Sequence, residues 1–160
     1  MVNRQQPHVR ILPENRANAE IATEFLVECG SPRQMQILPE AGGRDKVIAA
    51  FGSEYTRVMK RDSQGLMILL IDLDDNEDFQ RYSHQVPEDP AERVFVVGAK
   101  PDPEGLRAKT QLKFAQLGER LARECESDKC VLWEHESLQH NLAELKRLRE
   151  HIRPILFPPD

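Results

Sequence analysis

Acidic side chains that follow short apolar runs are the residues of this sequence best suited to chemistry. An unbroken apolar run at 66–71 leads directly into Asp72 and Asp74, while Glu14 and Glu40 close two earlier runs. Carboxylates gathered in one place repel each other unless a cation lies among them. Mg²⁺ takes oxygen ligands, commonly from one or two carboxylates and from substrate phosphates. The pattern predicts a Mg²⁺ site, with Mn²⁺ as an alternative ion, that serves phosphoryl transfer.

Other interpretations of the acidic segment 72–75 can be weighed on the same residues. A solvated loop that caps the following helix is the plain structural alternative. A calcium-binding loop is excluded, because Glu77 stands at the sixth position, where such a loop needs glycine. A phosphatase loop of the form DxDx(T/V) is a weaker rival, because Asn76 occupies the position of the threonine and the segment lies mid-chain.

Apolar patterns along the chain alternate between short β-type runs and longer segments of helical spacing. Strands are expected at 9–14, 34–40, 65–74 and 93–100. Helices are expected at 18–30, 42–62, 76–86, 105–126 and 134–152, the second of them broken near Gly52. Strands joined by helices imply right-handed crossovers and a mainly parallel sheet. We therefore predict a three-layer, Rossmann-like α/β fold with about four strands.

The predicted sheet determines where the acidic residues lie. The run at 66–71 suits a strand covered on both faces, so the third strand should be innermost. Sites of open parallel sheets form beyond the carboxyl ends of the strands. Residues two apart in a strand point to the same side, so Asp72 and Asp74 should face one crevice while Leu73 faces the other.

In this order of elements the chain resembles the Toprim family. The resemblance rests on Glu14 at the end of the first strand, Gly42-Gly43 after the second, and "IDLD" at the end of the third. It covers roughly residues 9–100 and implies a Toprim-like fold with a Mg²⁺ site. By this resemblance Glu14 would be the catalytic acid/base, and Asp72 and Asp74 would be metal ligands.

The resemblance implies phosphodiester chemistry on nucleic acid, as a nuclease or a nucleotidyl transferase of the small stand-alone branch. The family usually has glycine after the glutamate, where this chain has Asn15, and often an acid a few positions on, where it has Ala17-Asn18. These departures leave a second function open: a non-catalytic Toprim-like module that acts as a partner or regulatory subunit.

Basic side chains supply candidates for phosphate binding. Arg44 and Lys46 follow Gly42-Gly43 at the start of a predicted helix, where backbone N–H groups favour anions. Lys100 ends the fourth predicted strand, beside the acidic residues. The structural alternatives are a glycine turn and an ordinary solvated helix face. No Walker loop is present, because Gly-Lys-Ser/Thr is absent.

Cysteine and histidine recur every five residues near the end of the chain, at Cys125, Cys130, His135 and His140. Zinc sites favour closer cysteine pairs, and a step of five on a helix turns about 140° away. We therefore expect core thiols and surface histidines in place of a zinc site.

Composition bounds the protein class. The chain has 160 residues, 39% of them hydrophobic, which fits one domain with a core at about 9–100 and a helical extension at about 104–153. Three cysteines, no secretory segment and no long apolar run predict a cytoplasmic protein without a membrane span. A net charge of −5 argues against binding nucleic acid by bulk charge, although a local basic groove is compatible with it.

Overall fold

The structure, a computed structural model, describes residues 5–30, 33–73, 81–82, 84–86, 92–127 and 129–157. Its strands form one all-parallel, four-stranded sheet in the order β2-β1-β3-β4. The strands are β1 (His8–Pro13), β2 (Met35–Ile37), β3 (Gly65–Leu70) and β4 (Val94–Val97). This arrangement confirms the predicted α/β class and parallel sheet.

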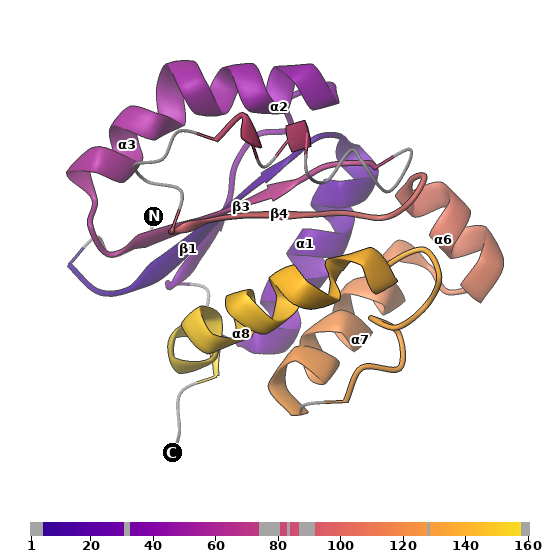
Figure 1. The fold of residues 1–160 in the computed structure, drawn as a ribbon. Coiled ribbons are helices and arrows are strands. Elements are labelled where there is room, and N and C mark those ends of the chain that lie inside the picture. The colour runs from indigo at the N-terminus through magenta and orange to yellow at the C-terminus, as the bar shows by residue number, and fades with distance from the viewer. Residues whose placement is uncertain are drawn as a thin grey trace.

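Helices cover both faces of the sheet and complete a three-layer fold (Figure 1). One face packs against α1 (Arg16–Cys29), α7 (Phe114–Ser127) and α8 (Leu142–Leu156). The other packs against a helix made of α2 (Arg44–Ala50), the π-helical η1 (Phe51–Tyr55) and α3 (Thr56–Arg61). The remaining helical segments are α6 (Pro103–Thr110) and the 3₁₀ turn η2 (Gln139–Asn141). Within the described ranges, no helix combines the length and the apolar character needed to cross a membrane.

The central strands bury side chains on both faces, as the unbroken apolar runs predict. In β3, Leu66 and Ile68 enter the cluster under α1, α7 and α8, while Met67 and Leu69 enter the cluster under α2 and α3. β3 shares the centre of the sheet with β1, whose six residues are also all buried.

Several helix boundaries differ from the sequence-based expectation. The helix predicted over 42–62 runs on through Gly52 by widening into one π-helical segment. The helix predicted over 105–126 is two helices, because Gln111 adopts a left-handed conformation (φ 59°) that ends α6. The helix predicted from 134 begins only at Leu142, after a series of turns. Most of the predicted helix 76–86 lies outside the described residues.

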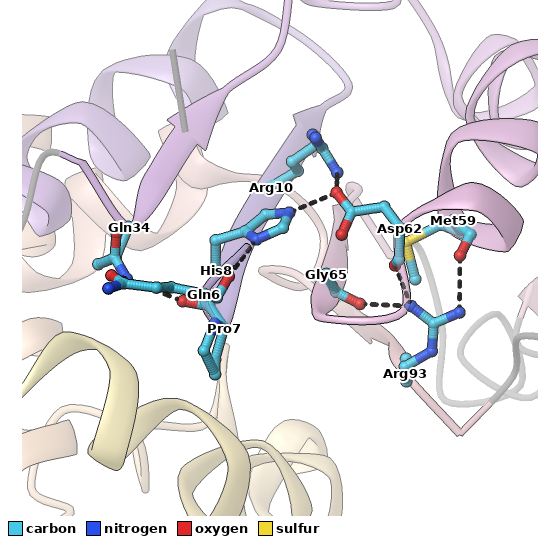
Figure 2. Close-up of polar contacts among 9 residues, drawn as sticks. All are labelled: Gln6, Pro7, His8, Arg10, Gln34, Met59, Asp62, Gly65 and Arg93. Atoms are coloured by element: carbon cyan, nitrogen blue, oxygen red, sulfur yellow. Dashed lines mark hydrogen bonds and ion pairs between the residues drawn. The ribbon is translucent and has the colours of Figure 1, made fainter. Parts of the chain in front are cut away.

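A buried polar cluster ties the amino ends of the strands together (Figure 2). Asp62, in the turn before β3, accepts hydrogen bonds from Nε2 of His8 (2.6 Å) and Nη1 of Arg10 (3.0 Å), both on β1. Arg93, just before β4, donates to the carbonyl oxygens of Asp62 and Gly65. Because polar groups this deeply buried need partners, the cluster fixes the relative positions of β1, β3 and β4 at this edge.

Helices α1 and α7 pack with their backbones in close contact at Gly118. A Cβ atom added there would lie 2.3 Å from the carbonyl oxygen of Ile21 and 2.9 Å from Cβ of Glu24. Gly118 is therefore required by the close approach of the two helices.

We expect Gly118→Ala to destabilise the protein by about 1–3 kcal/mol or more, because the helices must separate to admit one methyl group. Gly52→Ala is the matched control, since nothing lies within 4 Å of a Cβ at that helical position. The control should be neutral or stabilising by about 0.5–1 kcal/mol, as expected for alanine in a helix. Urea unfolding of the three proteins measures the difference, and equal stability of the two variants would contradict the close packing.

Candidate functional site

The carboxyl ends of β1 and β3 meet where the chain changes direction across the sheet. From β1 the chain passes through α1 to β2 on one side, and then through α2 and α3 to β3 on the other side. Such a switch point leaves a crevice between two neighbouring strands, and ligands of parallel sheets commonly bind there. Glu14 follows β1 and Asp72 lies two residues after β3, so the structure brings these two predicted residues together at the switch point.

Glu14 and Asp72 are linked by a hydrogen bond. Oε2 of Glu14 accepts from the backbone N–H of Asp72 at 3.0 Å. The backbone N–H of Glu14 in turn donates to the carbonyl oxygen of Leu70, which continues the pairing of the two strands. Asp72 points toward α1 while Leu73 is buried under α2 and α3, as strand alternation predicts.

Two asparagines at the start of α1 hold the Asp72 carboxylate. Nδ2 of Asn15 donates to Oδ2 of Asp72 (2.9 Å) and also lies 3.3 Å from Oε2 of Glu14. Nδ2 of Asn18 donates to Oδ1 of Asp72 at 2.9 Å. Asn15 is in addition the N-cap of α1, because its side-chain oxygen accepts from the N–H of Asn18. Asn15 thus connects both carboxylates to the helix start, where negative charge is favoured.

The turn after β2 brings one arginine near Glu14. The N–H of Gly42 donates to the carbonyl oxygen of Glu14 at 2.8 Å, and Gly42 has the positive φ of 92° that favours glycine. Arg44 follows at the start of α2, with Nε 3.9 Å from Oε1 of Glu14. At this distance, and with Arg44 about one third exposed, the arginine compensates the charge of Glu14 only in part.

The environment raises the pKa of Glu14 to about 7, from an ordinary value of 4.5. Burial is the main cause, and the hydrogen bonding and negative charge of the Asp72 side chain raise the pKa further. The backbone N–H of Asp72 and the charge of Arg44 lower it, but by less. A carboxyl group with this pKa exchanges a proton near neutral pH, which is the property of a general acid or base.

Oxygen donors at this edge suit a hard divalent cation. Glu14 and Asp72 are two carboxylates on neighbouring strands, and such pairs are the protein ligands that Mg²⁺ commonly uses together with water and phosphate. Burial raises the pKa of Glu14, and the neighbouring Asp72 carboxylate raises it further, whereas a bound cation would lower it. Among the described residues no group of three or more His, Cys, Asp or Glu gathers as a metal site, and Asp74 lies outside those residues. Glu14 and Asp72 are therefore the described part of the predicted ligand set.

The predicted phosphate-binding residues lie at the same edge of the sheet. Lys46 extends over Gly42 and Gly43, with its Cδ 3.7–3.8 Å from where their Cβ atoms would be. Lys100 follows β4, and its backbone N–H donates to the carbonyl oxygen of Ser137. Burial lowers the pKa of His140, and the charge of Lys100 lowers it further.

Cysteine and histidine residues in the second half of the chain do not assemble into a zinc site within the described part of the structure. Cys125 is buried in the core, as expected for a structural thiol, and burial raises its pKa to about 11. His140 Nε2 donates to the carbonyl oxygen of Gly98 at 2.8 Å, while Nδ1 of His135 accepts from the N–H of Ser137.

Asn15 and Asn18 are the site residues that the sequence did not suggest as partners of Asp72. A signal was present, because asparagine is a preferred N-cap and these two asparagines lie at or just before the start of the helix predicted at 18–30. That signal predicts where the helix begins but not that the same amide groups reach a neighbouring strand.

Comparison with models of known protein families finds no match to the chain, and searches of curated proteins and of solved structures likewise find none. The functional assignment therefore depends on the residues of the site.

We expect Glu14→Gln to stabilise the metal-free protein more at about pH 8 than at about pH 5. The folded-state pKa of about 7 lies above the ordinary 4.5, so the stability associated with Glu14 is lost as pH rises through this range. Glutamine never ionises but keeps the oxygen that accepts from the Asp72 N–H. The stability gain over wild type should increase by about 1–3 kcal/mol between the two pH values, measured by urea unfolding.

Glu40→Gln is the matched control, because Glu40 is an exposed carboxylate after β2. Its stability should follow that of wild type at both pH values. If both variants respond to pH alike, Glu14 is not the group responsible.

Proposed function

We propose that Glu14 and Asp72 form part of a Mg²⁺ site, with Asp74 as a further ligand, and that the protein performs phosphodiester chemistry on nucleic acid. The reaction would be that of a nuclease or a nucleotidyl transferase, as the resemblance to the Toprim family implies. The supporting observation is that two carboxylates meet at the switch point of a parallel sheet and receive only partial compensation from Arg44. A bound Mg²⁺ or Mn²⁺ would stabilise the charge that builds on a phosphate oxygen.

The residues of the chain would have separate roles in this reaction. Glu14, with a pKa of about 7, would give or take the proton of the attacking or leaving oxygen. Asp72 is held in one orientation by Asn15 and Asn18, as a preorganised ligand requires. Arg44, with Lys46 and Lys100 at the same edge, would bind substrate phosphates.

One observation favours a second function, that of a non-catalytic module. Asn15 donates to one carboxylate and lies within hydrogen-bonding distance of the other, and Asn18 donates to the remaining oxygen of Asp72. These amide groups thus donate to carboxylate oxygens that a cation would otherwise bind. A chain that keeps the fold in this way could serve as a regulatory subunit for a protein partner.

We propose a cytoplasmic location for either function. Cys29, Cys125 and Cys130, all within the described ranges, form no disulfide with one another. Reduced thiols suit a reducing compartment.

We expect about 10 mM Mg²⁺ at about pH 8 to stabilise the wild type by about 1–3 kcal/mol, a rise of several degrees in Tm. The pH lies above the pKa of Glu14, so the carboxylate is ionised and able to bind metal. Asp72→Asn should lose this response. Asp45→Asn is the matched control, because it removes the same charge from an exposed position of α2 nearby. An equal Mg²⁺ response in both variants would contradict a site at Asp72.

A nuclease assay separates the two functions. Wild type with Mg²⁺ or Mn²⁺ should cleave DNA or RNA, and Asp72→Asn/Asp74→Asn should lose at least about 100-fold in rate, as expected when charge stabilisation is removed. Equal cleavage by both preparations would reveal a contaminating nuclease. Absence of cleavage on single- and double-stranded DNA and RNA would reject the enzyme and favour the module.

A further inference from the structure

Strand β4 lies at one edge of the sheet, with β2 at the other, and within the described residues its strand partner is β3. An outer strand presents a row of backbone N–H and C=O groups that can pair with another chain. The sequence of β4, Val94–Val97, is VFVV, and all four residues are buried. It contains no charge and no proline, the features that usually discourage such pairing.

The segment 137–147, which we call the edge guard, bonds to the outward groups of β4 and its extension. At Gly98 the Asn141 amide acts as a strand would: Oδ1 accepts from the N–H (3.2 Å) and Nδ2 donates to the C=O (2.9 Å). Two residues further on, the N–H of Lys100 donates to the carbonyl oxygen of Ser137 at 2.9 Å.

The same pattern continues toward the amino end of β4. Oε2 of Glu144 accepts from the N–H of Val96 at 3.3 Å, and Nη2 of Arg147 donates to the C=O of Val94 at 2.7 Å. Glu144 and Arg147 also pair with each other at 2.7 Å, and the guanidinium lies 4.1 Å from the ring centre of Phe95. The edge guard therefore reaches every second residue of the edge, from 94 to 100.

Side-chain length explains how a helix can follow a strand. The three guard residues are spaced three apart, roughly 4.5 Å along a helix, whereas alternate strand residues are roughly 6.7 Å apart. The mismatch grows by roughly 2 Å at each step away from Gly98. The guard side chains lengthen in the same direction, from Asn141 through Glu144 to Arg147, so each longer side chain spans the larger offset.

We infer that the edge guard substitutes for a fifth strand and keeps the chain monomeric, and that β4 without it pairs with β4 of a second copy. Two identical strands pair antiparallel about a two-fold axis, so the uncovered edge is complementary to itself. Asn141 and Glu144 are buried, and each bonds to an outward backbone group of the edge, which makes them the residues that prevent this pairing.

The test is the mass of Asn141→Ala/Glu144→Ala in solution, measured by sedimentation over a range of concentrations. Gln139→Ala/Glu150→Ala is the matched control, because it also removes one amide and one carboxylate but from exposed positions. Wild type and control should sediment as monomers, and the guard variant should form dimers as its concentration rises. A folded guard variant that stays monomeric at all concentrations overturns the inference.

Amide hydrogen exchange supplies a readout that does not require the variant to dimerise. In dilute guard variant, the N–H groups of Val96 and Gly98 should exchange about tenfold faster than in wild type, because each loses one hydrogen bond. The N–H groups of β1 should be unchanged. If the double variant fails to fold, Glu144→Gln, which keeps an acceptor for the Val96 N–H, and Asn141→Leu, which loses the acceptor for the Gly98 N–H, are compared instead. Unchanged exchange at Gly98 in Asn141→Leu, or fast exchange of both amides in wild type, rejects the edge guard.

Discussion

The pairing of β1 with β3 is the constraint that determines which side chains meet at the two edges of the sheet, where the strands begin and where they end. The two strands run in register from His8 opposite Gly65 to Pro13 opposite Leu70. This register brings His8 and Arg10 to Asp62 at one end and Glu14 to Asp72 at the other. A slip of one residue would turn every side chain of β3 to the wrong face and would separate both pairs. The register therefore fixes the core and the site together.

The buried acidic residues at the two ends of this strand pair differ in how their negative charge is compensated. Asp62 is buried, and its Oδ2 accepts hydrogen bonds from His8 and from the cationic Arg10, so an arginine in direct contact compensates its charge. Among the described residues, Glu14 and Asp72 have amide partners and one partly exposed arginine, whose Nε lies 3.9 Å from Glu14. A carboxylate pair that its surroundings compensate so incompletely is typical of functional sites, whereas a matched ion cluster is typical of structural ones. This contrast supports the proposal that the functional site lies at the carboxyl ends of the strands.

The sequence predicted the sheet and the meeting of Glu14 with Asp72, because apolar runs reveal buried strands and parallel strands end at a common edge. It did not predict that Asn15 and Asn18 reach Asp72, since that contact depends on where the start of α1 lies relative to the end of β3. The end of α6 was missed because Gln111 gives no sign of a left-handed conformation. The late start of α8 was missed because residues 137–141 have a helical sequence pattern but form turns. In these turns Ser137 and Asn141 accept hydrogen bonds from the backbone that follows β4.

The position of α8 has a consequence for how the protein is made. The apolar core under α1 includes Ile152 and Leu156 of α8, together with strand residues from the beginning of the chain. During synthesis β4 therefore leaves the ribosome well before the segment that covers it. Contacts between such distant parts of a chain form late and slow folding, and uncovered strands are prone to aggregate in the interval. The newly made chain is thus most prone to aggregate in the interval when Val97 has left the ribosome and Asn141 has not.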